Sequence, residues 1–207
     1  MQSLLLATTN PAKARRLRWV FEGLGAEPRH LPKGAGPAPE ENGASFRANA
    51  ELKACFWSKR MGGLAAASDG GLCIPALGAK WDALRTARAA GLGVDDRERA
   101  EQLLKLAEGL AGEQRTAFWT EALALARDGQ LIASWEADGT KAVLMERFGP
   151  KDLRPGFWAA SLCYVPSLGT TLATLNEQQL AEADLTWSSL RSQVTACFAS
   201  WQPDSNG

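Results

Sequence analysis

The chain has 207 residues, a length that suits a single domain over residues 1–207, of one lobe or two, with room for a substantial core. Lys plus Arg and Asp plus Glu each total 23, so the formal net charge is zero, and we expect neither nucleic acid nor a membrane surface as a partner. The N-terminal apolar run is too short for a signal sequence or a membrane span, which predicts a soluble, cytoplasmic protein.

The cysteines and the histidine narrow the chemistry. The single histidine, His30, excludes a metal site built from several histidines, and its polar surroundings argue against a serine triad. The cysteines are widely spaced and form no CxxC pair, so we expect buried free thiols rather than a zinc site or a disulfide framework. They are Cys55, Cys73, Cys163 and Cys197. Catalysis must therefore use carboxylates and lysines.

The first candidate site is a strand, a tight loop and a helix N-terminus. Residues 3–8 predict a short buried strand, Asn10 is a natural N-cap, and Pro11 suits the first helical position. Free backbone N–H groups, the helix dipole and the Lys13 ammonium together make an anion site. The alternative is an ordinary capped turn with a surface lysine. The candidate phosphate-binding residues are Thr8, Thr9, Asn10 and Lys13.

The densest set of chemically useful groups lies in residues 40–71. The Pro- and Gly-rich residues 32–43 predict a loop that delivers Glu40 and Glu41 to a helix that Ser45 caps and Gly62 ends. On that helix one face carries Phe46, Asn49 and Lys53, at positions i, i+3 and i+7. This face is expected to be half core and half site.

Asp69 follows a short apolar strand, residues 64–67, in a Ser-Asp-Gly-Gly turn at the carboxyl end of that strand. Ligands of α/β sheets gather at such ends, although an aspartate beside glycines can also be a plain turn-former. Carboxylates brought together by a helix and a strand can hold a hard divalent cation. We therefore predict Mg²⁺ bound by Asp69 with Glu41 or Glu40, and Lys53 facing the oxygens of a phosphate ester.

The remaining pattern alternates helices with strands and contains no internal repeat. Asp128-Gly129 is the strongest hairpin signal in the chain. Residues 78–93 indicate a mobile basic loop, which either closes over phosphates or is a solvated surface. The other expected elements are a strand at 26–31, helices at 95–112 and 187–201, hairpin strands at 115–127 and 130–137, a third strand in 139–145, an aromatic segment at 155–166, and a short helix capped by Asn176.

Three blocks resemble, in order, the motifs of the inosine triphosphate pyrophosphatase family. They are Thr8-x-Asn10-x-x-Lys13, then Glu40-Glu41-x-Gly43-x-Ser45-Phe46-x-x-Asn49-Ala50-x-x-Lys53-Ala54, then Ser68-Asp69-Gly70-Gly71-Leu72. Ala87-Arg88 with Gly91 and the strand after Arg115 add weaker likeness, so that the resemblance spans roughly residues 3–166. The first block alone also fits the related inosine/xanthosine triphosphatases, but the second favours the first family.

Members of this family hydrolyse non-standard purine nucleoside triphosphates to the monophosphate and pyrophosphate. The resemblance implies an α/β fold with a long, twisted mixed sheet flanked by helices, in two lobes with a central nucleotide cleft, and a homodimer. It also implies that Asp69 accepts a proton or binds the metal, and that Lys13, Lys53 and the amides after Thr8 hold the leaving pyrophosphate. Asn49 and Gly70 join the expected substrate-binding residues.

The departures from the family pattern bear on substrate choice. The family's paired aspartates are Ser68-Asp69 here, so that a metal ligand or a supporting charge is lost. Its Gly-Phe-Gly-Tyr-Asp-Pro block is matched by Gly156-Phe157-Trp158-Ala159-Ala160-Ser161, its next helix has Leu180 for a lysine, and its Ser-His-Arg is Ser189-Leu190-Arg191.

These losses make the expected base pocket apolar and aromatic, whereas a site that reads one base needs fixed polar partners. We expect an altered or relaxed base preference, with Phe157, Trp158 and Arg191 contacting substrate. Trp158 either stacks on a base or packs in the core. The alternative is a catalytically impaired nucleotide-binding or interaction protein on the same scaffold.

Overall fold

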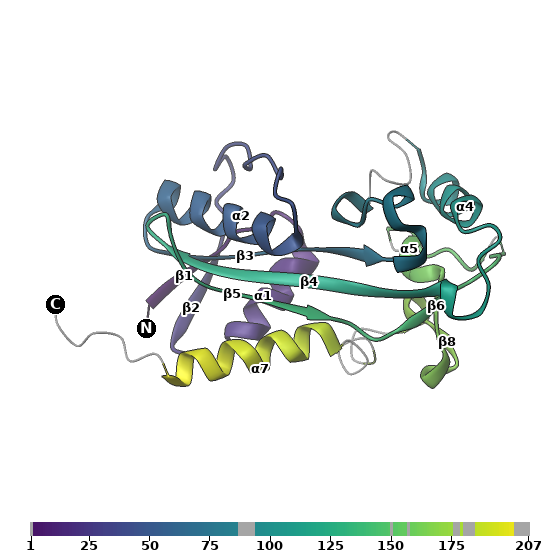
Figure 1. Ribbon diagram of the computed structural model, residues 1–207. Helices are drawn as coiled ribbons and strands as arrows, with labels where there is room; N and C mark the ends of the chain where they lie inside the picture. The colour runs from purple at the N-terminus through teal and green to yellow at the C-terminus, as the bar shows by residue number, and fades with distance from the viewer. Residues whose placement is uncertain are drawn as a thin grey trace. The chain divides into compact units, whose positions relative to one another are not determined.

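The computed structural model describes residues 2–86, 94–149, 151–156, 158–175, 179 and 185–200 (Figure 1). Its strands are β1 (Gln2–Leu6), β2 (Ala26–His30), β3 (Leu64–Cys73), β4 (Thr116–Arg127), β5 (Gln130–Asp138), β6 (Ala142–Leu144), β7 (Cys163–Val165) and β8 (Thr170–Thr171). Its α-helices are α1 (Pro11–Phe21), α2 (Phe46–Met61), α4 (Asp96–Leu106), α5 (Trp158–Ser161) and α7 (Leu185–Ser200). Short 3₁₀ helices cover Pro75–Lys80, Ala83–Arg85, Gly112–Arg115, Pro166–Leu168 and Leu172–Thr174.

The strands form one mixed sheet. Its order is β2-β1-β3-β4-β6-β7-β8, and β5 pairs with β4 outside this path. β1 is parallel to both β2 and β3, whereas the β4–β6, β6–β7 and β7–β8 pairs are antiparallel. The predicted α/β fold with a long mixed sheet is therefore confirmed.

The chain divides into two compact units, and the first comprises Met1–Gly70, Glu121–Ala137 and Thr186–Gly207. In this unit α2 covers one face of the strands, and α1 and α7 cover the other (Figure 1). The buried side chains of the α1 and α7 face make one core, because apolar residues recur at helical spacing on the helices and at every second strand position. They include Leu4, Leu6, Leu17, Phe21, Leu64, Ala66, Leu123, Leu125, Leu190 and Val194.

The second unit comprises Gly71–Thr120 and Asp138–Leu185 and has its own core. That core includes Leu72, Trp81, Leu103, Leu144, Trp158 and Leu162. Trp158 is 7% exposed, so its side chain packs among apolar neighbours. This position favours the core-packing alternative for Trp158, and its contact with a base stays a prediction.

The hairpin and the helix starts follow local sequence rules. Asp128 and Gly129 have φ values of 48° and 88°, which suits the predicted hairpin turn between β4 and β5. Asn10 and Ser45 cap α1 and α2, as predicted. Helix α2 ends at Gly62, and the C-terminal helix is also confirmed.

Other predictions of local structure need correction. The turn predicted at residues 68–71 is wrong, because β3 continues through Gly70 and Gly71 to Cys73 in extended conformation. Both glycines lack a positive φ, and the pairing of β3 with β4 gives this stretch a hydrogen-bonded neighbour that the local sequence does not reveal. Two 3₁₀ helices, Pro75–Lys80 and Ala83–Arg85, overlap the basic loop predicted at residues 78–93. Helix α4 ends at Leu106, earlier than expected.

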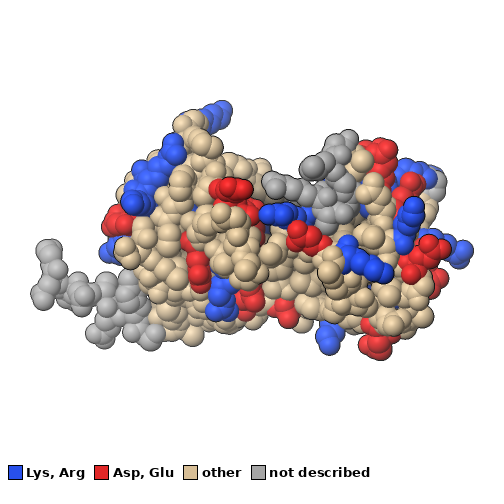
Figure 2. Space-filling model, turned by 45° about the horizontal axis from the view of Figure 1, so that its top comes forward, with Lys and Arg blue, Asp and Glu red and all other residues tan. Residues whose placement is uncertain are grey.

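The four cysteines form no disulfide bond, as the sequence predicted, but only Cys163 is buried and the other three are partly exposed. None of the described helices is long and apolar enough to cross a membrane. Figure 2 shows acidic and basic side chains interspersed over the face that it draws, in keeping with the balanced charge of the chain. Several residues used in the predictions lie outside the described residues, namely Ala87, Arg88, Gly91, Phe157, Asn176, Leu180 and Trp201.

Candidate active site

The N-terminus of α1 is organised by side chains of the preceding loop. The Asn10 side-chain oxygen accepts hydrogen bonds from the backbone N–H groups of Ala12 at 2.9 Å and Lys13 at 3.3 Å. The Thr8 hydroxyl accepts one from the Asn10 N–H at 3.1 Å. Pro11 has no N–H to satisfy. The first-turn N–H groups that were expected to be free to bind an anion are thus already hydrogen-bonded. The Lys13 ammonium and the threonine side chains remain to face a ligand.

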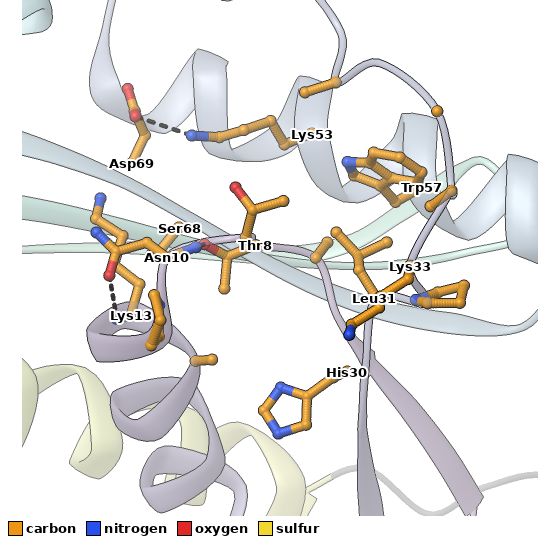
Figure 3. A pocket seen from close by; sticks show the side chains of 18 of the residues that line it. Thr8, Asn10, Lys13, His30, Leu31, Lys33, Lys53, Trp57, Ser68 and Asp69 are labelled. Atoms are coloured by element: carbon orange, nitrogen blue, oxygen red, sulfur yellow. Dashed lines mark hydrogen bonds and ion pairs between the residues drawn. The ribbon is translucent and has the colours of Figure 1, made fainter.

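A second group of polar side chains joins α2 to β3. The Lys53 ammonium donates to the Asp69 carboxylate at 2.9 Å (Figure 3). It also donates to the Glu41 carboxylate at 3.0 Å. The Asn49 amide donates to the other Asp69 oxygen at 3.1 Å, while its own oxygen accepts from the Gly43 N–H at 2.8 Å. Both oxygens of Asp69 are therefore held in place.

Burial makes this group electrostatically strong. Asn49, Lys53 and Asp69 are 2%, 9% and 7% exposed, whereas the Glu41 side chain is 46% exposed. A buried ammonium and a buried carboxylate are tolerated because each compensates the lost hydration of the other. Glu41 is the solvated member of the group and is free to change partner at low cost.

A pocket of about 1010 Å³ opens over these groups, entirely within the first unit. The last registered pair of β1 and β3 is Leu6 with Ala66, and the Ala7 N–H still donates to the Ala66 oxygen. Beyond that point β3 runs on without β1, so its edge is open at Ser68 and Asp69. Of the predicted site residues, those lining the pocket are Thr8, Thr9, Asn10, Lys13, Glu41, Lys53 and Asp69.

Successive side chains of β3 point to opposite faces of the sheet, which separates Ser68 from Asp69. Asp69 faces α2. Ser68 shares the face of Ala66, which packs against α1. Ser68 is 3% exposed, and its hydroxyl has no hydrogen-bond partner among the described residues although it lines the pocket.

Glu121 on β4 is a charged residue near the pocket that the sequence reasoning missed. Its carboxylate lies 2.8 Å from the Lys13 ammonium, as an ion pair whose angles do not meet those of a hydrogen bond, and its side chain is 7% exposed. The available signal was a glutamate at the start of the apolar run Ala122–Ala126, since a buried strand seldom holds a charge without a function or a partner. His30, Arg15 and Lys33 also line the pocket unpredicted.

Five predicted residues lie elsewhere or outside the described chain, and one of them is Trp158 in the core of the second unit. Glu40 is exposed and does not line the pocket, and Gly70 continues β3 beyond it. Arg191 lies at the opposite end of α1 from Asn10: its guanidinium stacks 4.6 Å from the Trp19 ring centroid and donates to the Trp19 and Glu22 carbonyl oxygens. Phe157 is not among the described residues.

The available carboxylates suit a Mg²⁺ ion that also binds water and substrate better than a metal ion whose ligands all come from the protein. Nowhere in the described residues do three or more His, Cys, Asp or Glu side chains gather in a way that would hold a metal. Glu41 and Asp69 do converge on one ammonium. Mg²⁺ is usually bound by one or two carboxylates and completes its shell with water and substrate phosphates. Two carboxylates beside a pocket therefore fit this ion.

Comparison with known proteins gives one consistent result. The Ham1 family profile matches residues 4–180. A dITP/XTP pyrophosphatase of Anaeromyxobacter sp. is 34% identical over an alignment of 208 positions that covers 85% of this chain and 88% of that protein. A dITP/XTP pyrophosphatase of Thermus thermophilus is 34% identical over 193 residues, covering 93% and 90% of the two chains. The solved structure of a HAM1 protein from Coxiella burnetii aligns with a TM-score of 0.80 at 25% identity, over 97% of this chain and 100% of that one.

Proposed function

The chain belongs to the Ham1 family, and from this premise we propose that it is a Mg²⁺-dependent nucleoside triphosphate pyrophosphatase. In the proposed reaction a water attacks the α-phosphorus, the bond from that phosphorus to the bridging oxygen breaks, and the nucleoside monophosphate and pyrophosphate leave. The observation that carries the proposal is the buried Asp69 carboxylate, oriented by Asn49 and Lys53 at the edge of the pocket.

Asp69 is the group placed to accept the proton of the attacking water. A carboxylate offers about four lone-pair positions, and Asn49 and Lys53 occupy one on each oxygen, which leaves acceptor capacity for water. The two donors also fix the carboxylate in one orientation, so that no reorganisation is needed at the moment of reaction.

Glu41 and Asp69 are the residues that would hold Mg²⁺, with Glu40 as a second choice. When bound, the ion supplies charge neutralisation at the phosphate oxygens and lowers the pKa of a bound water. Glu41 suits this role because its side chain is 46% exposed and reaches Lys53 from the solvent side. Glu40 would need the loop to move, since its side chain is exposed and outside the pocket lining.

The triphosphate chain meets the positive side of the pocket. Lys13 and Lys53 stand on opposite faces of β3 and offer two ammonium groups to the β- and γ-phosphates. The Thr8 and Thr9 hydroxyl groups and the side-chain NH₂ group of Asn10 add donors next to the positive end of the α1 dipole. Asn49 and Gly70 complete the proposed substrate-binding residues.

We expect the base preference to be altered or relaxed compared with a strict preference for 6-oxo purines. The support is chemical: the expected base-reading positions hold Phe157, Trp158 and Ala160, which offer no side-chain acceptor or charged partner to a base edge. Phe157 and Trp158 remain the proposed contacts with the base, whereas Arg191 is held by Trp19 and Glu22 at the far end of α1. The homodimer that the resemblance implies also remains a prediction.

The test is pyrophosphate release from a panel of triphosphates with Mg²⁺. The wild-type chain should release pyrophosphate from several bases, and Asp69→Asn should lower kcat by about 10³-fold, the range of a lost general base. Asp128→Asn in the β4–β5 turn is the matched control, because Asp128 is exposed, lies outside the pocket and keeps a residue type that tolerates its positive φ.

Three results would count against parts of this proposal. Undiminished turnover in Asp69→Asn would remove the mechanism. Triphosphate binding without pyrophosphate release by the wild type would favour the alternative of an impaired nucleotide-binding protein. A strong preference for inosine or xanthosine triphosphate would overturn the relaxed base preference.

A further inference from the structure

Two ammonium–carboxylate pairs flank β3 at the pocket, and only one of them uses a residue of β3. On the α2 face Lys53 pairs with Asp69 at 2.9 Å. On the α1 face Lys13 pairs with Glu121 of the neighbouring strand at 2.8 Å, while Ser68, the β3 residue on that face, carries no charge and its hydroxyl has no hydrogen-bond partner. The resemblance in sequence places an aspartate where this chain has Ser68.

The pairing of β3 with β4 places Glu121 on the same face of the sheet as Ser68. The Asp128 N–H donates to the Gly63 oxygen, just after β4 ends and just before β3 begins, so the two neighbouring strands run antiparallel. Ser68 continues the face of Leu64 and Ala66 along β3, and Glu121 continues the face of Leu125 and Leu123 along β4. Leu64, Ala66, Leu123 and Leu125 share one core, which confirms that these faces coincide.

We propose that Glu121 supplies, from β4, the carboxylate that Ser68 lacks on β3, and that it acts as the positioning residue of Lys13. The inference rests on the pyrophosphatase function proposed above. Glu121 holds the Lys13 ammonium over the pocket, where it meets the phosphates of the substrate. In this view the aspartate missing at position 68 would have supplied a supporting charge on the α1 face. The carboxylates proposed to bind the metal, Glu41 and Asp69, are both present on the α2 face.

Burial explains why a carboxylate is needed to hold Lys13. The Lys13 side chain is 26% exposed, so without a partner its flexible stem can carry the ammonium into water. The Glu121 side chain is 7% exposed and lies within β4, so its carboxylate cannot move out into solvent with the lysine. A neutral hydroxyl at position 68 gives too weak a field to hold an ammonium against hydration. Fixing the ammonium before substrate arrives lowers the cost of binding phosphate.

The proposal is tested with Glu121→Gln, which keeps the size of the side chain and removes its charge, and with Ser68→Asp in the same background. Glu101→Gln on the exposed face of α4 is the matched control, because Glu101 pairs with Arg97 in solvent. Glu121→Gln should lower kcat/KM by about tenfold, mainly through KM. The added Ser68→Asp should restore most of the loss, which a merely structural role for Glu121 would not allow.

Two further readouts separate this inference from the proposed function. Trace acetylation of Lys13 in the full chain, measured by peptide mass spectrometry against the exposed Lys105, needs no substrate. Acetylation should rise about threefold in Glu121→Gln and fall back in the double variant, because the ion pair holds the ammonium in wild type. The Mg²⁺ concentration for half-maximal rate should stay within about twofold of wild type, as expected for a residue that does not bind the metal.

Unchanged Lys13 acetylation in Glu121→Gln overturns the inference whether or not the chain is active. So does a double variant no better than Glu121→Gln, or a large shift in Mg²⁺ dependence, which would make Glu121 a metal ligand. If the wild type releases no pyrophosphate, the proposed function fails, while the acetylation result still decides whether Glu121 holds Lys13. If Glu121→Gln does not fold, Glu121→Asp replaces it, and equal acetylation of Lys13 and Lys105 in wild type overturns the inference.

Discussion

The buried pair of Lys53 and Asp69 makes a quantitative prediction about stability. Both side chains are about nine-tenths buried, with exposures of 11% and 10%. We consider Lys53→Met, which keeps the apolar stem and removes the ammonium, Asp69→Asn, and the double variant. The free energies of unfolding of these variants form a double-mutant cycle, whose coupling energy measures the interaction directly.

The structure sets the size of each effect. Lys53→Met leaves the Asp69 carboxylate with Asn49 as its one hydrogen-bond donor, so we expect a loss of about 3 kcal/mol, the lower end for an orphaned buried charge. Asp69→Asn should cost about 2 kcal/mol, since Lys53 keeps Glu41 as a partner. In Asp69→Asn the new side-chain NH₂ group faces the NH₂ group of Asn49, so two donors meet. The Asn49 side chain cannot rotate to present its oxygen instead, because that oxygen accepts from the Gly43 N–H.

The double variant contains no orphaned buried charge, because Glu41 is solvated. It should therefore cost about 3 kcal/mol rather than the sum of about 5 kcal/mol, which gives a coupling energy of about 2 kcal/mol. Urea unfolding of the four proteins at pH 7, followed by circular dichroism, measures all terms of the cycle. Single costs that add within about 0.5 kcal/mol would refute the reasoning, and so would a Lys53→Met cost below about 1 kcal/mol.

Two further predictions concern a buried thiol and a helix cap. Complete burial raises the pKa of Cys163 to about 12 from its ordinary value of 9.0, so the unfolded chain loses this proton first. The free energy of unfolding should fall above pH 9, by about 1.4 kcal/mol per pH unit from this group, and Cys163→Ala should remove that part of the slope in urea titrations at pH 9 to 11. Asn10→Ala should lower the free energy of unfolding by about 1 kcal/mol, because two first-turn amides lose their acceptor, whereas Asn10→Ser should lose far less; equal losses would show that the cap contributes nothing.

Features set by neighbouring residues could be predicted from the sequence. Asn10 and Ser45 cap helices because a side-chain oxygen reaches an N–H two or three residues later, and Asp128-Gly129 turns the chain because both adopt positive φ. The shared face of Asn49 and Lys53 likewise follows from helical spacing alone. These interactions are complete within one element and need no knowledge of the fold.

Features set by partners far along the chain could not be predicted. Gly70 and Gly71 look like a turn, yet they are extended, because β3 is hydrogen-bonded to β4. Glu121 can be read from the sequence, but only the three-dimensional structure shows that its carboxylate reaches Lys13. Arg191 was expected to contact substrate from its likeness to a motif, and its contacts at the far end of α1 depend on how α7 packs.

The division of the chain into two cores bears on how a base preference can change without loss of the reaction. Lys13, Lys53, Asp69 and Glu121 all belong to the first unit, which holds the phosphate-facing groups around one continuous set of strands and helices. Trp158 belongs to the core of the second unit. We expect a substitution in that core to leave the buried ion pairs of the first unit in place, because the two sets of residues belong to separate cores. Under the proposed function, base-reading positions in the second unit could therefore become apolar while the proposed phosphate-binding groups of the first unit are kept.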